Sequence, residues 1–254
     1  GDAEGVDPAD LGVEAHHLTE GAEDADYQHA ELDEDGSVGT VFFNKGFEAR
    51  LELTQAQRGA WLGATGAQYS IRDFDAVGSE AFLPRHTSRQ FGLFTVQQLD
   101  TGSVRIEAGA RFEHSTLTAS PDLALPQFFA GTRSFSTFSA SAGASYSFAP
   151  GWKLGMNLSR TSRAPAGEEL FANGPHAGTQ AFEIGNPDLE PERAWSVEAI
   201  LRGGGAGYSF EASAYYNWFS NFIYDDRTGA IEEGLPVYQL RQANARTYGF
   251  EVQA

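Results

Sequence analysis

The residues best suited to chemistry gather near the N-terminus, in the stretch HHLTEGAEDADYQHAELDED at residues 16–35. This stretch holds three of the six histidines of the chain among many carboxylates, and it contains no lysine or arginine. Neutral imidazole is a good ligand for zinc, and carboxylates complete the coordination where no thiolate is present. The stretch therefore predicts a divalent metal site built from His16, His17, His29, Asp24 and Asp26.

The spacing of these histidines leaves a second interpretation open. A pair of adjacent histidines followed by a lone histidine twelve residues later matches no fixed metal-binding motif. The same stretch could be a solvated acidic segment whose histidines bind nothing. Calcium could bind the carboxylates alone, but it would not use the imidazoles.

The negative charge of the chain is concentrated at one end. The 254 residues carry 35 acids and 17 bases, a formal charge of −18, and residues 1–44 hold 13 of the acids and none of the bases. Such a field repels nucleic acid and attracts cations. The chain has no cysteine, and no Ser-His-Asp grouping, phosphate-binding loop or dinucleotide-binding turn is present. We therefore expect no enzyme, no catalytic cofactor and no nucleic-acid partner.

Alternation of apolar and polar residues is the dominant pattern from residue 45 onward. In FEARLELT, at residues 47–54, every second residue is apolar and the others are charged or polar. The stretches VRIEAGARFEH at 104–114 and FEASAYYNW at 210–218 repeat this pattern. A period of two is that of a β-strand with one apolar and one polar face.

Nine strands are predicted from this alternation. Many reach the ~9–11 residues needed to cross a bilayer at a tilt, whereas strands of soluble proteins average about five or six. The predicted strands lie at about residues 45–55, 60–72, 88–99, 103–114, 134–148, 152–161, 192–202, 208–220 and 241–254.

Short and long connections alternate between the predicted strands. The short ones lie near residues 57–59, 100–102, 149–151 and 203–207, and the long ones at about 73–87, 115–133, 162–191 and 221–240. Short turns on one edge and long loops on the other are typical of outer-membrane barrels, whose long loops face outside the cell. By this parity we expect residues 1–44 to form an acidic, His-containing extracellular loop and residues 45–254 to form the barrel wall.

The sequence therefore favours an all-β fold, an antiparallel transmembrane β-barrel with long extracellular loops. Bacterial barrels have an even number of strands, so about nine strands would be part of a larger barrel. No apolar run approaches the ~18 residues of a spanning helix, which excludes a helical membrane protein. A soluble β-sandwich with one polar face is the alternative fold.

Aromatic residues lie near both ends of the predicted strands. Phe148 and Trp152 flank a short turn, and Trp195, Tyr216 and Trp218 lie toward the long-loop edge. These are girdle positions, where an amphipathic ring meets lipid headgroups. In a soluble protein the same rings would belong to the core.

Three motifs carry a resemblance to a known family. SRAP at 162–165, EELFANG at 168–174 and GNPDLEPE at 185–192 precede an alternating strand. Together they resemble TonB-dependent outer-membrane receptors. GPHAGTQAFEIGNPDLEPE at 174–192 and YSIRDFDAVGSEAFLPRHTSRQFGLF at 69–94 most resemble the zinc-uptake (ZnuD-type) branch.

The resemblance implies a barrel of about 22 strands in the bacterial outer membrane, with an N-terminal plug and a TonB-box peptide. No segment here resembles plug or box, so we expect a portion of the barrel. The implied cargo is zinc or a similar divalent ion, with His176 as a plausible ligand, and the implied partners are outer-membrane lipid and the TonB complex. Haem or an iron chelate is the alternative cargo, with His176 as an iron ligand. A soluble secreted cation-binding β-protein is the alternative of another class.

Overall fold

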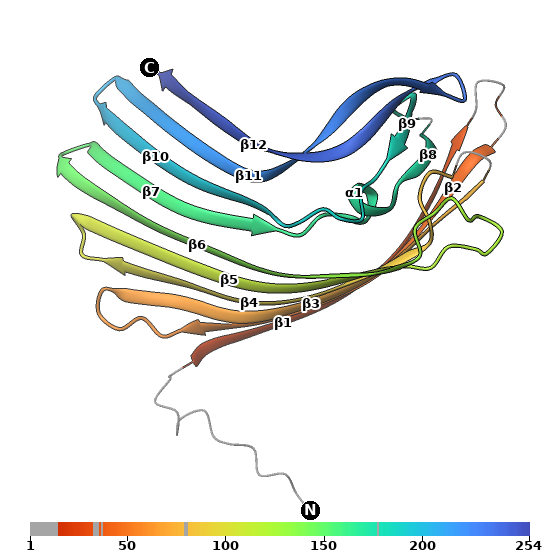
Figure 1. Cartoon of the computed structure of the whole chain (residues 1–254). Coiled ribbons are helices and arrows are strands. Elements are labelled where there is room, and N and C mark those ends of the chain that lie inside the picture. Colours follow the sequence, from red (N-terminus) through yellow and green to blue (C-terminus); the bar gives the residue numbers. More distant parts are fainter. Residues whose placement is uncertain (1–14, 33–35, 37, 79–80, 177) are drawn as a thin grey trace, which may run out of the picture.

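A computed structural model describes residues 15–32, 36, 38–78, 81–176 and 178–254, and within them the chain is almost entirely β-sheet (Figure 1). Ten long strands follow one another across the sheet. They are β1 (Ala15–Leu32), β2 (Val38–Gln55), β3 (Trp61–Gly78), β4 (His86–Asp100), β5 (Val104–Ala119), β6 (Gly131–Ala149), β7 (Trp152–Arg163), β10 (Glu192–Gly205), β11 (Tyr208–Glu232) and β12 (Leu235–Gln253).

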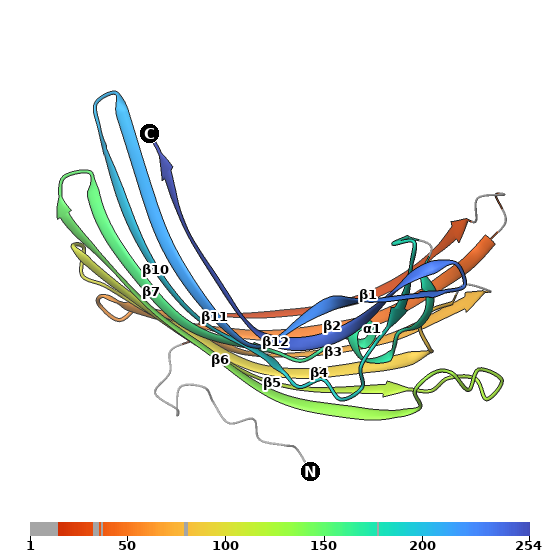
Figure 2. The same ribbon diagram turned by 45° about the horizontal axis from the view of Figure 1, so that its top comes forward.

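The sheet is a single layer that curls into a deep trough, seen from two sides in Figures 1 and 2. The strand order is β1-β2-β3-β4-β5-β6-β7-β10-β11-β12-β9-β8, and each long strand is antiparallel to the long strands beside it. One curved layer confirms the predicted partial barrel, and the alternative of a two-layer sandwich is wrong.

The alternation of side chains sorts apolar and polar residues onto opposite faces of the trough. In β2, Phe47 and Leu51 are exposed on the convex face. The intervening Glu48 and Arg50 bond across the concave face, where Gln68 donates to Glu48 and the Arg50 guanidinium lies 4.2 Å from the ring centroid of Phe94. A wall that is apolar outside and polar inside is the arrangement of a transmembrane β-barrel.

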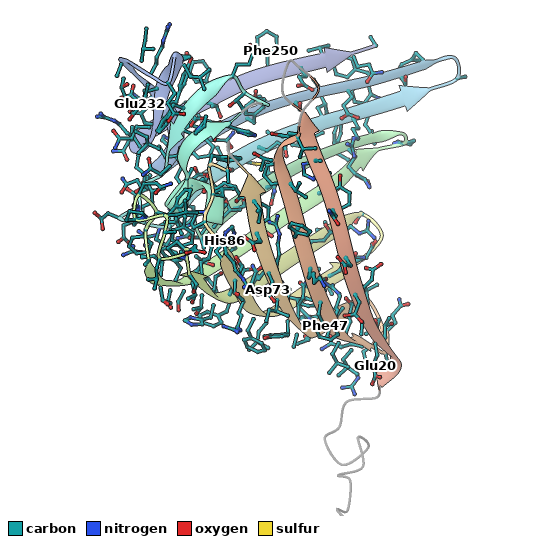
Figure 3. All side chains as sticks on the ribbon, turned by 90° about the vertical axis from the view of Figure 1, so that its right-hand side faces the viewer. Glu20, Phe47, Asp73, His86, Glu232 and Phe250 are labelled. Carbon is teal, nitrogen blue, oxygen red and sulfur yellow. The ribbon has the colours of Figure 1, made fainter. Side chains whose placement is uncertain are left out.

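The two rims of the trough differ in the way predicted from the sequence. One rim carries tight turns, such as the two-residue connections β6–β7 and β10–β11, and the other carries the longer segments after β3, β5 and β7. The strands extend further into the long-loop rim than predicted. Residues 221–240, expected as a loop, continue β11 and β12 into a projecting hairpin that has Glu232 at its tip (Figure 3).

The acidic stretch is not a loop over Ala15–Leu32. This part of the chain forms β1, which pairs with β2 along almost its whole length. Residues 1–14, the first part of the predicted loop, lie outside the described residues. An antiparallel ladder bonds backbone to backbone, so the free edge of β2 supplies partners for a segment that lacks apolar periodicity.

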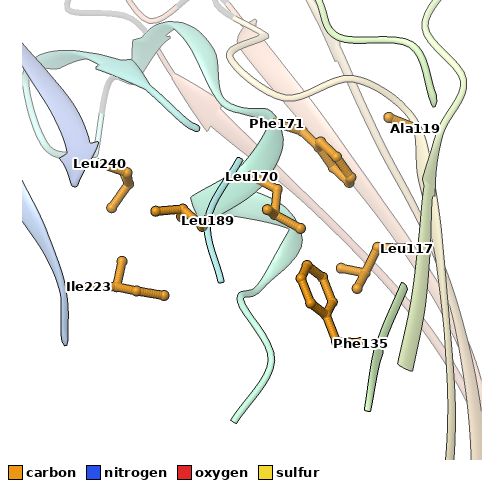
Figure 4. Packing of buried hydrophobic residues seen from close by; sticks show 8 residues of the cluster. All are labelled: Leu117, Ala119, Phe135, Leu170, Phe171, Leu189, Ile223 and Leu240. Atoms are coloured by element: carbon orange, nitrogen blue, oxygen red, sulfur yellow. The ribbon is translucent and has the colours of Figure 1, made fainter. Parts of the chain in front are cut away.

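The connection between β7 and β10 folds into the concave side of the trough. It contains the helix α1 (Gly167–Phe171) and the short strands β8 (Asn173–His176) and β9 (Ala181–Ile184), and β9 pairs with β12 in parallel. We call residues 164–191 the mouth segment. Its Leu170, Phe171 and Leu189 pack in a buried cluster with residues of the surrounding wall (Figure 4), which are Leu117, Ala119, Phe135, Ile223 and Leu240.

The wall has a seam between β6 and β7. The two strands pair from Ala140 to Ala149 of β6, whereas residues 131–139 pair only with β5. Side chains bridge the gap. The Ser162 amide donates to Ser139 Oγ at 3.0 Å, and Arg160 Nη1 donates to the Phe138 carbonyl at 2.7 Å.

Aromatic side chains mark both rims of the convex face. Phe148, Trp152 and Phe210 cluster beside the short turns, with neighbouring ring centroids 6.2–6.3 Å apart. The rings of Tyr216 and Trp218, whose centroids are 4.3 Å apart, lie toward the other rim. The predicted girdle positions are therefore on the exposed convex face. Within the described residues, no helix has the length and apolar character that a membrane span requires.

Candidate functional site

The motif residues of the mouth segment hold it against the wall through one arginine. Arg163, at the end of β7, donates to both carboxylate oxygens of Glu169 at 2.8 and 2.9 Å, and it lies 3.5 Å from Glu192. Glu169 also caps α1 by accepting from the Ala166 amide at 2.8 Å. Two parallel bonds fix both the position and the orientation of the guanidinium. The SRAP and EELF motifs are thus the two halves of one clamp.

Beyond this clamp, the β8–β9 hairpin presents a histidine with a carboxylate on its own hairpin. His176 Nδ1 lies 2.9 Å from Glu183 Oε1, and Thr179 Oγ1 donates to the same oxygen at 2.7 Å. The imidazole stacks on Phe82, with centroids 4.0 Å apart and planes at 15°. Hydrogen bond and stacking together fix the ring, so its Nε2 atom has a defined direction.

A second carboxylate approaches the free nitrogen of His176 from the far edge of the sheet. Glu31 of β1 places its Oε1 atom 4.0 Å from His176 Nε2. A side chain on Gly178 would crowd this gap, because its Cβ would lie 3.2 Å from Nε2 and 3.4 Å from Glu31 Oε1. The imidazole therefore sits between two carboxylates, one on each side.

Electrostatics at this site favour the charged pair. The hydrogen bond to Glu183 raises the pKa of His176 above its ordinary value, against the opposing effect of burial, and the charge of Glu31 adds to the rise. Burial acts to raise the pKa of Glu183, but the bonds from His176 and Thr179 outweigh it and bring that pKa below its usual range. The two carboxylates thus stabilise a positive charge at the imidazole, and a metal ion that binds Nε2 would take the place of its proton.

The described residues contain no preformed group of three or more histidine, aspartate and glutamate side chains close enough to hold a metal ion. In the structure, Nδ1 of His176 is taken by Glu183 and the gap to Glu31 is 4.0 Å. His176 Nε2 and Glu31 are thus two donors that a small movement would bring to one ion. Further ligands would have to come from elsewhere.

The acidic stretch does not bring its predicted ligands together. Asp24 and Asp26 lie opposite Phe47 and Lys45 and so face the convex side, whereas His29 lies opposite the buried Phe42 on the concave side. His29 stacks on Phe42, with centroids 4.6 Å apart. Directly opposed residues share a face and successive residues alternate, so these three side chains cannot share one ion.

The adjacent histidines lie at the other end of the same strand. His16 and His17 are at the start of β1, and their side chains lie outside the described residues. Twelve residues of strand separate His17 from His29, which is roughly 40 Å at the rise of an antiparallel strand. At that separation His17 and His29 cannot bind the same metal ion.

The remaining two histidines have structural partners. His86 is buried at 2% exposure, and its Nδ1 lies 3.0 Å from the Pro84 carbonyl. Its ring packs between Phe74 and Phe171, beneath α1. His114 bonds to Ser136 Oγ at 2.9 Å. His86 therefore anchors the mouth segment to the wall.

The sequence did not point to the partners of His176. Glu31 belongs to the acidic stretch but was not predicted as a ligand, and neither Glu183 nor Phe82 was predicted as a neighbour. The spacing of His176 and Glu183, across a short hairpin rich in glycine, is the one local signal that could have found a partner. Nothing local connects residue 31 with residue 176.

A curved single-layer sheet, apolar outside and polar inside, with a segment folded into its mouth, defines the class of outer-membrane β-barrel proteins. More particularly, residues 11–254 match the family model described as TonB dependent receptor-like, beta-barrel. The chain belongs to this family. Membership rules out the alternative of a soluble secreted cation-binding protein.

Solved structures show the same fold at low sequence identity. A copper transporter, OprC, has a TM-score of 0.74 and 17% identity over 92% of this chain and 39% of its own. The Serratia marcescens hemophore receptor HasR, in complex with its hemophore HasA and heme, has a TM-score of 0.66 and 14% identity over 93% and 46%. The FrpB iron transporter from Neisseria meningitidis has a TM-score of 0.66 and 13% identity over 92% of this chain and 37% of its own. The chain thus spans less than half the length of each.

Proposed function

We propose that this chain forms wall and mouth of a TonB-dependent outer-membrane receptor that takes up zinc or a similar divalent metal ion. The observation that carries the proposal is His176, held between Glu183 and Glu31 at the concave side of the long-loop rim. Imidazole with carboxylates is a ligand set suited to zinc when thiolates are absent, and the chain has no cysteine.

The geometry gives each group a role. Glu183 fixes the ring and its tautomer through Nδ1, as outer-shell carboxylates do for metal-binding histidines. His176 Nε2 then faces the ion, and Glu31 closes the 4.0 Å gap as the proton leaves the imidazole. We propose that further ligands come from the plug, and that TonB-coupled movement of the plug opens the site and releases the ion inward.

The acidic stretch contributes by concentrating cations rather than by forming one compact site. Residues 1–44 hold 13 acids and no bases, and such a field raises the local concentration of divalent ions. We propose that the part of this stretch nearest the long-loop rim faces outside the cell. Glu31, the acid of β1 that approaches His176, would then pass such ions to the site.

Calorimetry of the full-length receptor with zinc tests this proposal. A His176→Ala variant should lose at least about tenfold in affinity, because even an outer-shell partner of a metal-binding histidine contributes about 10–100-fold. His114→Ala is the matched control, because His114 bonds only to Ser136 in the described structure. Unchanged zinc affinity in His176→Ala would remove His176 from the site and this proposal with it.

Haem or an iron chelate is a second candidate cargo. The printed names of similar structures include a receptor with heme and an iron transporter, and the stacking of His176 on Phe82 offers an aromatic surface beside a possible axial ligand. Mixing the full-length receptor with haemin would then give a shifted Soret band that His176→Ala abolishes. A zinc isotherm without any Soret shift decides for the divalent ion.

A further inference from the structure

A row of arginine and tryptophan side chains crosses four neighbouring strands of the wall. Arg160 of β7 is directly opposite Trp195 of β10, Trp195 is opposite Trp218 of β11, and Trp218 is opposite Arg246 of β12. Directly opposed residues of adjacent strands point to the same face. The sequence Arg-Trp-Trp-Arg therefore runs side by side over about 14 Å, three strand spacings.

This row lies on the convex face. Leu158 and Met156 lie an even number of residues from Arg160 along β7, so they share its face. Tyr248 and Phe250 likewise share the face of Arg246 on β12, and all four are exposed. Trp195 and Trp218 are themselves 49% and 44% exposed. These apolar residues lie between the row and the short turns. The row therefore marks the border of the apolar band that faces the long-loop rim.

A third arginine joins the row. Arg193 lies two residues before Trp195 in β10, on the same face and nearer to the long-loop rim. Among the described residues, no carboxylate lies within 4.0 Å of the guanidinium groups of Arg160, Arg193 or Arg246. Three cations thus surround two tryptophans with no acid to neutralise them, in a chain whose formal charge is −18.

Elsewhere toward the long-loop rim, two pairs of opposite charges are already matched. On β1 and β2, Asp26 lies 3.5 Å from Lys45. Beyond the row, on the β11–β12 hairpin, Arg241 lies 3.0 Å from Asp226. Arg89 of β4, opposite Ile71, is also unmatched among the described residues of this face, but three unmatched cations come together at the border of β7, β10, β11 and β12, where they complement an anion.

We propose that Arg160, Arg193 and Arg246 bind the phosphate groups of a phosphorylated lipid headgroup in the outer leaflet, with Trp195 and Trp218 against its glycerol or sugar part. A guanidinium binds phosphate through paired hydrogen bonds, and tryptophan prefers the headgroup level. Basic clusters beside membrane-spanning elements bind anionic headgroups in the same way. The inference rests on the membrane-spanning wall and is independent of the cargo.

The row is well suited to hold a lipid in one orientation. Arg160 already donates one N–H to the Phe138 carbonyl, which fixes its side chain and leaves the other N–H groups for a ligand. Below it, the exposed Leu158, Met156 and Phe250 supply an apolar surface for acyl chains. The phosphate would lie toward the long-loop rim and the acyl chains toward the middle of the wall, which is how a lipid of the outer leaflet is oriented.

The test is native mass spectrometry of the full-length receptor in detergent, with added lipid A as the phosphorylated probe and its dephosphorylated form as the comparison. Wild-type protein should retain lipid A and lose most of this retention when the phosphates are removed. A triple variant, Arg160→Gln with Arg193→Gln and Arg246→Gln, should bind lipid A about 100-fold more weakly, since each surface cation contributes about fivefold.

Two controls separate a phosphate site from a general effect of charge. Replacing Arg50, Arg105 and Arg202 by Gln removes the same charge from the concave face and should leave lipid A retention unchanged. Lysine at positions 160, 193 and 246 should restore most of the retention. Equal retention of the two lipid forms by wild-type protein would overturn the proposal, and this comparison needs no variant to fold. Equal losses in the convex and concave triple variants would also overturn it.

Discussion

His176 and Glu183 face each other across the β8–β9 hairpin, with Nδ1 of the imidazole 2.9 Å from Oε1 of the carboxylate. The pKa of His176 is raised and that of Glu183 is lowered. The stabilisation from a raised histidine pKa is complete below about pH 6.5 and is lost as pH rises through the folded pKa. The glutamate contribution is lost as pH falls below about 4.5, so the pair is strongest between these values.

The hairpin should therefore loosen as pH rises above neutrality. This chain has no cysteine, so a spin label at Gln180→Cys reports on this hairpin alone once any cysteines elsewhere in the full-length receptor are replaced by serine. Its mobility, measured by electron paramagnetic resonance in the full-length receptor, should increase between pH 6 and pH 9. A label at Leu123→Cys, on the loop after β5, gives the control that should not change. Glu183→Gln should remove the pH dependence, and a persistent response in that variant would show that another group is responsible.

Packing of the mouth segment depends on Leu189, which is 1% exposed within the cluster formed with Leu170 and Ile223. Leu189→Ala leaves a cavity there, a change that typically costs about 2–5 kcal/mol. Limited proteolysis should then cut within residues 164–191 at least about thirtyfold faster, since cleavage follows the population of the opened segment. Leu123→Ala is the control, because Leu123 is fully exposed at 100%. Equal cleavage rates in the two variants would contradict this role for Leu189.

Gly167 is required because of its closeness to His86. A Cβ atom at residue 167 would clash with His86 Nε2, and His86 is buried beneath α1. We expect Gly167→Ala to destabilise the mouth segment and His86→Ala to do so through lost packing. In the double variant the two costs should not add, since the clash partner is gone. Thermal melts of the four proteins measure this coupling, and strictly additive shifts would count against the contact.

All four tryptophans of the chain lie near the rims of the wall: Trp61 and Trp152 by the short turns, Trp195 and Trp218 toward the long loops. We expect their fluorescence in reconstituted bilayers to be quenched more by lipids brominated near the headgroup than by lipids brominated near the acyl-chain end. Stronger quenching from the deep position would place the rings at the bilayer centre and would contradict the girdle.

The period of two was sufficient to predict the wall. Each of the nine predicted strands is present, because sustained alternation of apolar and polar residues matches the geometry of a strand and does not match that of a helix. Strand ends were predicted less well. Residues 221–240 contain Asp225, Asp226 and Glu232 and alternate poorly, yet they continue as strands because β11, β12 and β9 satisfy one another's backbone groups. Backbone pairing of this kind leaves little trace in the choice of side chains.

The site was predicted only in part, for a related reason. His176 was found through its motif, but its neighbour Glu31 lies 145 residues away in sequence and reaches it only because the sheet curls. Conversely, the density of acids and histidines at residues 16–35 suggested a compact site. As β1, that density is spread along a strand, with Asp24 and His29 on opposite faces. Composition predicts the charge of a segment, and only the backbone conformation decides which charges meet.

The seam between β6 and β7 gives the rim a mechanical property of its own. Residues 131–139 of β6 are joined to β7 through Ser139, Ser162 and Arg160, and no ladder of backbone hydrogen bonds connects the two strands there. Side-chain links of this kind yield at lower force than a ladder, so the described part of the wall is compliant along this seam. Arg133, in the part of β6 that does not pair with β7, also donates a hydrogen bond to the Leu189 carbonyl. A pull on the inner segment would therefore be felt first as a change in the width of the rim.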